Sequence, residues 1–296
     1  MKKFFLVLTL LCLSLSAWAY EAEVNEIFYN LDKVNRTATV TKYNNVYSGD
    51  VVIPGTVTYN GITYSVTSLG DYCFGGCYWL TSITIPNSVT SLGEECFAGC
   101  RSLTSIILGN SVKSLGNYCF WGCSSLTSIT IPNSVTSLGD YCFAGCSGLT
   151  SITIPNSVKS LGIRCFYGCS SLTSITIGNS VTSLGESCFV SCSSLTSIYM
   201  LPSTPPSTGG SIFGGTLLKT VYVVDEDAKT AYQAQAPWNE YEIVVMPTGI
   251  EEVETDKTAP TIVGYYDLNG KLINGKQRGA VIVRYSDGTA RKVLVK

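Results

Sequence analysis

The amino-acid sequence predicts a repeat solenoid of short parallel strands plus short helical segments, followed by a small all-β C-terminal module. Two observations carry this prediction. A unit of 23 residues recurs six times between residues 69 and 201 without an insertion. Every unit also contains a Cys-Phe-x-x-Cys motif followed closely by Leu-Thr-Ser-Ile. A unit this short cannot bury its own apolar face, so neighbouring units must stack.

Each unit is expected to contain one short strand and one short helical segment. In the first unit, Ile83 and Ile85 alternate with polar residues, which is the pattern of a strand with one buried face. Pro86 lacks an N–H group and ends that strand. Cys73 and Cys77 are separated by about one helical turn, so we expect a short helix closed by glycine across residues 71–77.

Equivalent positions of successive units, here called columns, should align when the units stack. The phenylalanine of the motif and the leucine after it are expected to point inward in every unit. The phenylalanines are Phe74, Phe97, Phe120, Phe143, Phe166 and Phe189. An asparagine column is expected to satisfy backbone groups at the turns, and it contains Asn87, Asn110, Asn133, Asn156 and Asn179.

Twelve of the 13 cysteines lie in the repeats, two in each unit. Three interpretations are open for them: buried free thiols, disulfides or metal sites. Side chains at i and i+4 of a helix are about 5–6 Å apart at Cβ, whereas a disulfide needs roughly 3.5–4.5 Å. An apolar column without histidine also lacks the second shell of a metal site. Buried thiols are therefore favoured, with no metal and no cofactor.

Composition argues against several classes of function. The chain has no histidine, which removes the commonest general base and metal ligand, so we expect no enzyme and no catalytic residues. With 19 basic and 21 acidic residues it also lacks the basic stripe of a nucleic-acid-binding protein. No segment after the N-terminus has the roughly 20 apolar residues of a transmembrane helix.

The N-terminus has the features of a secretory signal peptide over residues 1–19. Lys2 and Lys3 precede an apolar stretch, and Ala17 and Ala19 form a small-x-small cleavage motif. A secreted or cell-surface location is therefore expected.

The repeat motif C-F-x-G-C-x-x-L-T-S-I-x-I-P resembles the leucine-rich repeats of BspA type, found on exported proteins of Bacteroidetes. The resemblance covers 69–201, and it extends upstream through residues 51–54 and the turn at 59–61, which look like that family's N-terminal cap. The family usually has alanine before the phenylalanine, where this chain has cysteine in all six units. The resemblance implies that the protein binds a protein partner, or mediates adhesion, at a host or bacterial surface.

The ends of the array are expected to be capped, because stacked units leave apolar surface exposed at both ends. We expect an N-terminal β cap at residues 20–68, a C-terminal capping repeat at 202–247 with a helix near 227–236, and a linker with a β module at 248–296. Strands are predicted at 262–268, 280–285 and 292–296, joined through Asn-Gly and Asp-Gly turns. This module is similar to the C-terminal sorting tails of Bacteroidetes.

The units differ from one another mainly beside the Cys-Phe-x-x-Cys motif, where aromatic residues replace small ones. Exposed aromatic side chains on a rigid stack are suited to contact a protein or to stack on sugar rings. Scattered surface residues that shield the backbone are the favoured interpretation of the individual side chains. For a binding role, a protein partner is favoured and a glycan is the alternative. The candidate contact residues are Tyr72, Tyr78, Trp79, Tyr118, Trp121, Tyr141 and Tyr167.

Overall fold

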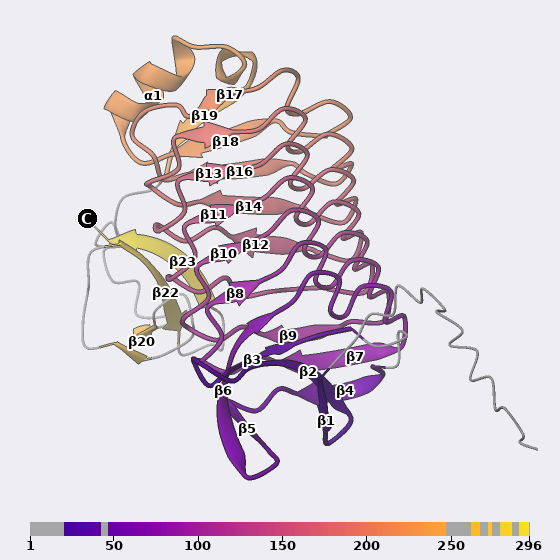
Figure 1. Cartoon of the computed structure of the whole chain (residues 1–296). Helices are drawn as coiled ribbons and strands as arrows, with labels where there is room; N and C mark the ends of the chain where they lie inside the picture. The colour runs from indigo at the N-terminus through magenta and orange to yellow at the C-terminus, as the bar shows by residue number, and fades with distance from the viewer. Residues whose placement is uncertain are drawn as a thin grey trace, which may run out of the picture.

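The computed structural model describes residues 21–42 and 47–246, together with the backbone of four strands between residues 262 and 295. In the described region, coils stack from the N-terminal hairpins to a single α-helix at the other end (Figure 1). The predicted signal peptide at 1–19, the acidic linker at 251–256 and the turns at 269–270 and 287–288 lie outside the described residues.

One side of each coil is the predicted strand, paired in parallel with its equivalent in the next coil. Ser174, Ile175 and Thr176, for example, pair with the residues 23 positions later. Two sheets result, because the coil at residues 127–131 has no strand, although Ile129 and Ile131 remain buried. The strands are β4 (Gly49–Val52), β7 (Leu80–Thr84), β9 (Ser105–Ile107), β12 (Ser151–Thr153), β14 (Ser174–Ile177), β16 (Ser197–Met200), β18 (Thr220–Val223) and β19 (Glu242–Val245).

A second side is a ladder of two-residue strands, in a part of each unit for which no strand was predicted. Each strand contributes one buried leucine, replaced by Thr208 in the last strand. From Ser114 on, each strand pairs in parallel with the next, whereas Ser91–Leu92 pairs with the N-terminal segment. The strands are β8 (Ser91–Leu92), β10 (Ser114–Leu115), β11 (Ser137–Leu138), β13 (Ser160–Leu161), β15 (Ser183–Leu184) and β17 (Ser207–Thr208). Between the two sides, the asparagine column acts as predicted in two places: Asn110 and Asn179 donate backbone N–H groups to Asn87 and Asn156 Oδ1.

The third side carries the Cys-Phe-x-x-Cys motif, and here the prediction of a short helix is wrong. Residues 71–76 form consecutive tight turns. Tyr72 (φ 54°) and Gly76 (φ 75°) both have left-handed backbone conformations that interrupt a helix. The amides of Tyr72, Phe74 and Gly76 donate to carbonyls of the next coil at 2.7–2.9 Å instead of to their own segment. Backbone pairing between coils thus replaces the hydrogen bonds of a helix.

The core consists of the predicted inward columns. Every phenylalanine of the motif and every following leucine is fully buried. The phenylalanine rings stack along the axis with centroids 5.2–5.6 Å apart. Tyr47 continues the stack at the N-terminal end, 4.6 Å from Phe74. Phe213 continues it at the other end, where Trp238 meets that ring edge-on.

The N-terminal segment is a set of antiparallel hairpins, and two of its strands pair with the first strands of the two ladders. The hairpins are β1–β2, β2–β3 and β5–β6. β6 then pairs in parallel with β8, while β4 pairs with β7, so each ladder begins on a strand of this segment. The remaining strands are β1 (Ala22–Val24), β2 (Ile27–Asp32), β3 (Thr37–Val40), β5 (Thr56–Tyr59) and β6 (Ile62–Leu69).

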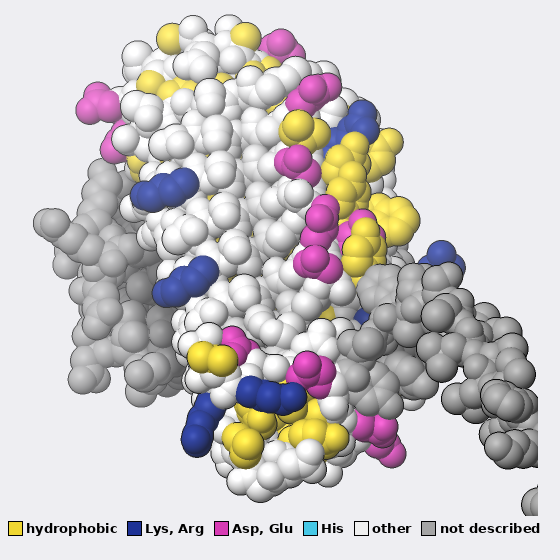
Figure 2. Space-filling view, viewed as in Figure 1, with side chains coloured by type: hydrophobic (Ala, Val, Ile, Leu, Met, Phe, Trp, Pro, Cys, Tyr) yellow, Lys and Arg dark blue, Asp and Glu magenta, His cyan; other side chains and the backbone are white. Residues whose placement is uncertain are grey.

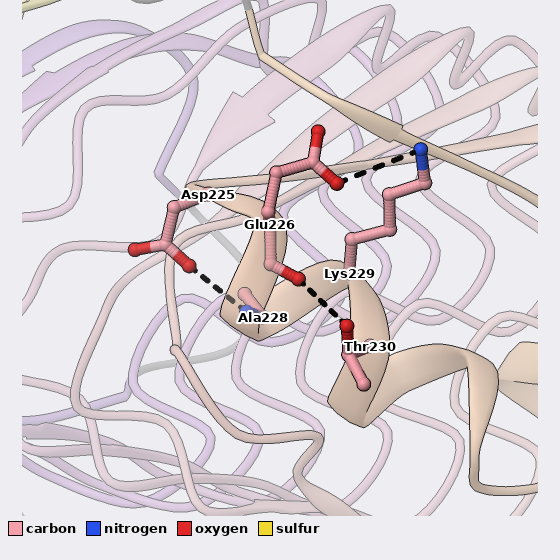
Figure 3. Close-up of polar contacts among 5 residues, drawn as sticks. All are labelled: Asp225, Glu226, Ala228, Lys229 and Thr230. Atoms are coloured by element: carbon pink, nitrogen blue, oxygen red, sulfur yellow. Dashed lines mark hydrogen bonds and ion pairs between the residues drawn. The ribbon is translucent and has the colours of Figure 1, made fainter.

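The predicted helix near the C-terminal end of the stack is confirmed as α1 (Glu226–Gln233). Its N-cap is Asp225, whose Oδ1 accepts the Ala228 N–H at 2.9 Å. Lys229 lies 3.8 Å from Glu226 Oε2, and Thr230 donates to the Glu226 carbonyl (Figure 3). The 3₁₀ helix η1 (Trp238–Glu240) and strand β19 follow. The parallel sheet therefore continues beyond residue 201 through β18 and β19.

The C-terminal residues include a separate antiparallel sheet in the order β21-β20-β22-β23. Its strands agree in position with the predicted ones to within a few residues, apart from the short β21. They are β20 (Ile262–Tyr266), β21 (Leu272–Ile273), β22 (Gly279–Tyr285) and β23 (Ala290–Val295).

Candidate interaction surface

The residue before the first cysteine of each motif has the same unusual backbone conformation in all six coils. Its φ lies between 51° and 57° although glycine never occupies the position. A left-handed conformation costs a non-glycine residue on the order of 1 kcal/mol. The column consists of Tyr72, Glu95, Tyr118, Tyr141, Arg164 and Ser187. The backbone is therefore constant along this side while the side chains change.

Five of the seven candidate aromatic residues are exposed as predicted. Trp79 is the most exposed at 76%, Trp121 is 49% exposed and Tyr167 is 40% exposed. Tyr72 and Tyr78 are also exposed. The other two, Tyr118 and Tyr141, are only half-buried, because one ring covers the other.

Tyr118 and Tyr141 stack with ring centroids 4.7 Å apart and planes 9° from parallel. Arg164, one coil further on, donates from Nη1 to the Tyr141 hydroxyl at 2.6 Å. Its guanidinium carbon lies 5.6 Å from the centroid of Tyr141 and 5.7 Å from that of Tyr167. This contact holds a cation between two aromatic rings of adjacent columns.

A second part of the same column pairs an aromatic residue with a carboxylate. The Tyr72 hydroxyl donates to Glu95 Oε1 at 3.0 Å. This hydrogen bond raises the pKa of Tyr72. Nearby, the guanidinium of Arg101 lies 5.4 Å from the centre of the Tyr78 ring. Trp79, beside Tyr78, has no such partner among the ring contacts of the described residues.

All five acidic residues of the repeats lie on this side of the stack, either in the left-handed column or immediately before it. Figure 2 shows hydrophobic side chains in a band along the stack with acidic side chains beside them. Asp71 and Asp140 accept backbone N–H groups of the following coil at 2.7–2.8 Å. None of the five forms an ion pair with a described residue. They are Asp71, Glu94, Glu95, Asp140 and Glu186.

We call this surface the aromatic–acidic face. It is formed by the five acidic residues, by Arg101 and Arg164, and by Tyr72, Tyr78, Trp79, Tyr118, Trp121, Tyr141 and Tyr167. Sequence reasoning found the aromatic residues but gave no role to Arg101 or to most of the acids. The signal was available, because each of these charged residues lies in the column of Tyr72, in the column of Tyr78, or directly before the column of Tyr72.

The twelve cysteines of the repeats lie behind this face and are all free and buried. In five coils the second cysteine donates from Sγ to a phenylalanine carbonyl of the preceding coil at 3.0–3.2 Å. Burial raises the pKa of the Cys77 thiol to about 12 and raises that of Cys146 as well. Among the described residues, no group of three His, Cys, Asp and Glu side chains could hold a metal ion. The thiols act as small core side chains, and these five each donate one weak hydrogen bond.

Comparison with known proteins identifies the repeat. The sequence model of the family described as BspA type leucine rich repeat region matches residues 56–139 and 115–234. No match is found among curated proteins. Within the described part of the chain, no helix combines the length and apolar character that crossing a membrane requires.

Two solved structures are similar in fold and sequence. A leucine-rich repeat protein of T. pallidum is 26% identical, with a TM-score of 0.54 over 69% of this chain and 85% of that one. A leucine rich cell surface protein of Faecalibacterium prausnitzii A2-165 is also 26% identical, with a TM-score of 0.60. The similarity covers 91% of this chain but only 59% of the Faecalibacterium protein.

Proposed function

Because the chain belongs to the BspA-type leucine-rich repeat family, we propose that it is an exported, non-catalytic scaffold that binds a protein partner or mediates adhesion at the cell surface. The fold supplies a rigid support, since the coils pair through all three sides. The observation that carries the proposal is the left-handed column, where a strained and constant backbone presents tyrosine, glutamate, arginine or serine according to the coil.

Export and surface attachment rest on sequence features at the two ends. The signal-like residues 1–19 would direct export, and the module at 248–296 resembles sorting tails. The similar Faecalibacterium protein is described as a cell surface protein, which supports the same location for this chain. Between these ends, 20–68 would cap the array, 69–201 would form the repeats and 202–247 would close it.

Localisation of the chain with and without residues 264–296 tests the attachment proposal. Full-length protein should be found at the surface of the producing cell, and the truncated form should not reach it. Surface delivery of the truncated form at the full-length level would contradict a sorting role for the module.

Adhesion can be tested with substitutions that the repeat already contains. Trp121→Ala and Tyr167→Ala place in their coils the residue found at Ala98 and Ala144 of the same column. The double variant should fold normally and lose most binding of the purified chain to target cells, measured by flow cytometry. A matched control is Lys113→Thr with Lys159→Thr, in a column otherwise occupied by threonine. Equal binding by both double variants would refute the role of the face.

A glycan remains the second candidate ligand, because Trp79 and Trp121 expose large parts of their rings. Aromatic rings of this kind can stack on the apolar faces of sugars. A glycan array would show binding that Trp79→Ala and Trp121→Ala reduce. An array without any binding would remove this candidate.

A further inference from the structure

We propose that the aromatic–acidic face binds arginine or lysine side chains presented by a partner protein, and that Trp121 and Glu95 form its central cation site. This inference rests on the proposed function, in which the same face contacts a protein partner. It goes further by stating the chemistry of the partner segment, which is basic.

The chain contains an internal example of this recognition. Arg164 lies between the rings of Tyr141 and Tyr167 and donates to the Tyr141 hydroxyl. One ring belongs to the preceding coil and the other to the coil of Arg164 itself. A guanidinium group therefore fits between the two columns, at a place where the backbone geometry recurs in every coil.

Two coils earlier, the positions of Tyr141 and Tyr167 are occupied by Glu95 and Trp121. The Tyr141 hydroxyl, which accepts a hydrogen bond from Arg164, is thus replaced by the Glu95 carboxylate. The phenol ring of Tyr167 is replaced by the indole of Trp121. Both replacements strengthen the attraction for a cation, since indole is the best cation–π acceptor and a carboxylate adds a full charge. Position 118, equivalent to Arg164, holds a tyrosine that stacks on Tyr141 instead. The chain supplies no cation of its own in this coil.

The second oxygen of the Glu95 carboxylate is available to accept a hydrogen bond from a partner. The Tyr72 hydroxyl occupies Oε1, and no ion pair with a described residue involves the Glu95 carboxylate. Trp121 is 49% exposed, so its ring can be reached from solvent. The neighbouring Glu94 adds a second carboxylate with no ion pair to a described residue.

Charge along the stack favours the same partner. Every acidic residue of the repeats lies on this face, and the guanidinium groups of both arginines of the repeats lie over its aromatic rings. The two lysines of the repeats, Lys113 and Lys159, lie instead in the threonine column that borders the two-residue strands. A basic segment laid along the face would meet carboxylates in several coils, whereas a neutral glycan would gain nothing from them.

Fluorescence anisotropy with a labelled oligo-arginine peptide tests the proposal on the full chain lacking residues 1–19. The peptide should bind, binding should weaken with added salt, and an oligo-citrulline peptide of equal length should not bind. Trp121→Ala and Glu95→Gln should each lower the affinity by roughly two- to fivefold. Ile107→Thr, which replaces an exposed side chain on the strand side by the residue found there at Thr130 and Thr153, should leave the affinity unchanged.

Arg164→Ser provides a test in the opposite direction. The next coil has serine at this position, Ser187. The change removes the guanidinium group that contacts the rings of Tyr141 and Tyr167. The variant should bind the oligo-arginine peptide several-fold more tightly than the parent chain, because a competing internal cation is gone. A simple loss of structure cannot produce such a gain.

Several results would overturn the proposal. They are equal binding of the arginine and citrulline peptides, no binding of either, unchanged affinity in both Trp121→Ala and Glu95→Gln, or weaker binding in Arg164→Ser. Adhesion lost in Trp121→Ala with Tyr167→Ala, but without peptide binding, would leave the proposed function standing and reject only the basic partner. Binding on a glycan array through the same residues would likewise reject it in favour of a sugar ligand.

Discussion

Phe120 and Phe143 stack in the core with ring centroids 5.2 Å apart and planes 10° from parallel. Phe166 lies at 5.3 Å on the other side of Phe143, so that ring is covered on both faces. Each coil thus contributes one ring to a stack that runs from Tyr47 to Phe213.

Phe143→Ala should reduce the free energy of unfolding by about 3–5 kcal/mol, because it leaves a cavity in the middle of this stack. Urea unfolding followed by circular dichroism measures the loss. Phe143→Leu retains much of the buried volume without the ring and should cost clearly less. Equal losses for both variants would mean that the buried volume retained by leucine contributes nothing, and that the cavity does not explain the loss.

Gly139→Ala should destabilise the fold through the close approach of two coils. A Cβ atom at residue 139 would lie 2.6 Å from the backbone nitrogen of Asn117. Relief of this clash should cost about 1–3 kcal/mol, seen as a lower urea midpoint. Gly210→Ala is the control, because its nearest neighbour would be the flexible Glu186 side chain at 3.5 Å. A Gly139→Ala protein as stable as the control would show that the coils can separate without cost.

Asp140→Ala should lower stability by about 1 kcal/mol, since it removes the acceptor of the Ile163 N–H at 2.7 Å. Glu186→Ala changes the charge equally in the same column, and Glu186 accepts no hydrogen bond through its side chain among the described residues. Differential scanning calorimetry of the two variants should therefore show a drop in Tm for Asp140→Ala alone. Matching shifts would assign the effect to charge and not to the hydrogen bond.

The fold should lose stability steeply above about pH 8.5, the pKa of a thiol in an unfolded chain. Burial raises the folded-state pKa of eight thiols, and a hydrogen bond with Cys123 is the largest cause of the raised pKa of Cys100. The eight are Cys77, Cys96, Cys119, Cys123, Cys142, Cys146, Cys169 and Cys188. The folded state then keeps protons that the unfolded state has released, so the free energy of unfolding falls as pH rises.

Urea unfolding in the presence of a reductant between about pH 7 and 9.5 measures this slope, to which each thiol adds up to about 1.4 kcal/mol per pH unit. Cys146→Ala should make the slope shallower, whatever its effect at pH 7. A free energy of unfolding that stays constant with pH would contradict the burial of protonated thiols.

The period and the core were predictable from the sequence, because an uninterrupted repeat forces equivalent residues such as Phe74 and Phe97 into register. The prediction of a helix over residues 71–77 was wrong, and the reason is specific. The spacing of Cys73, Phe74 and Cys77 fits one helical turn, but nothing in the residue type shows that Tyr72 adopts a left-handed conformation. Backbone pairing with the next coil then replaces helical hydrogen bonds.

The candidate face was predictable only as a set of exposed aromatic residues. Which of them meet depends on side-chain rotamers, and so the stacking of Tyr118 on Tyr141 and the place of Arg164 needed the structure. The exposure of Trp79 followed from its position outside the inward columns. The location of all five acidic residues of the repeats on one face could have been found from the sequence once the columns were aligned.

The hydrogen bonds that join successive coils recur every 23 residues, as from Thr104 to Thr81 and from Thr173 to Thr150. A coil therefore has the same interface above and below, apart from the few positions that differ between units. In genetic terms, in-frame duplication or loss of one unit rejoins two surfaces that already match. The length of the array can change by recombination while both caps stay intact, and each such event also shifts which side chains stand next to one another on the aromatic–acidic face.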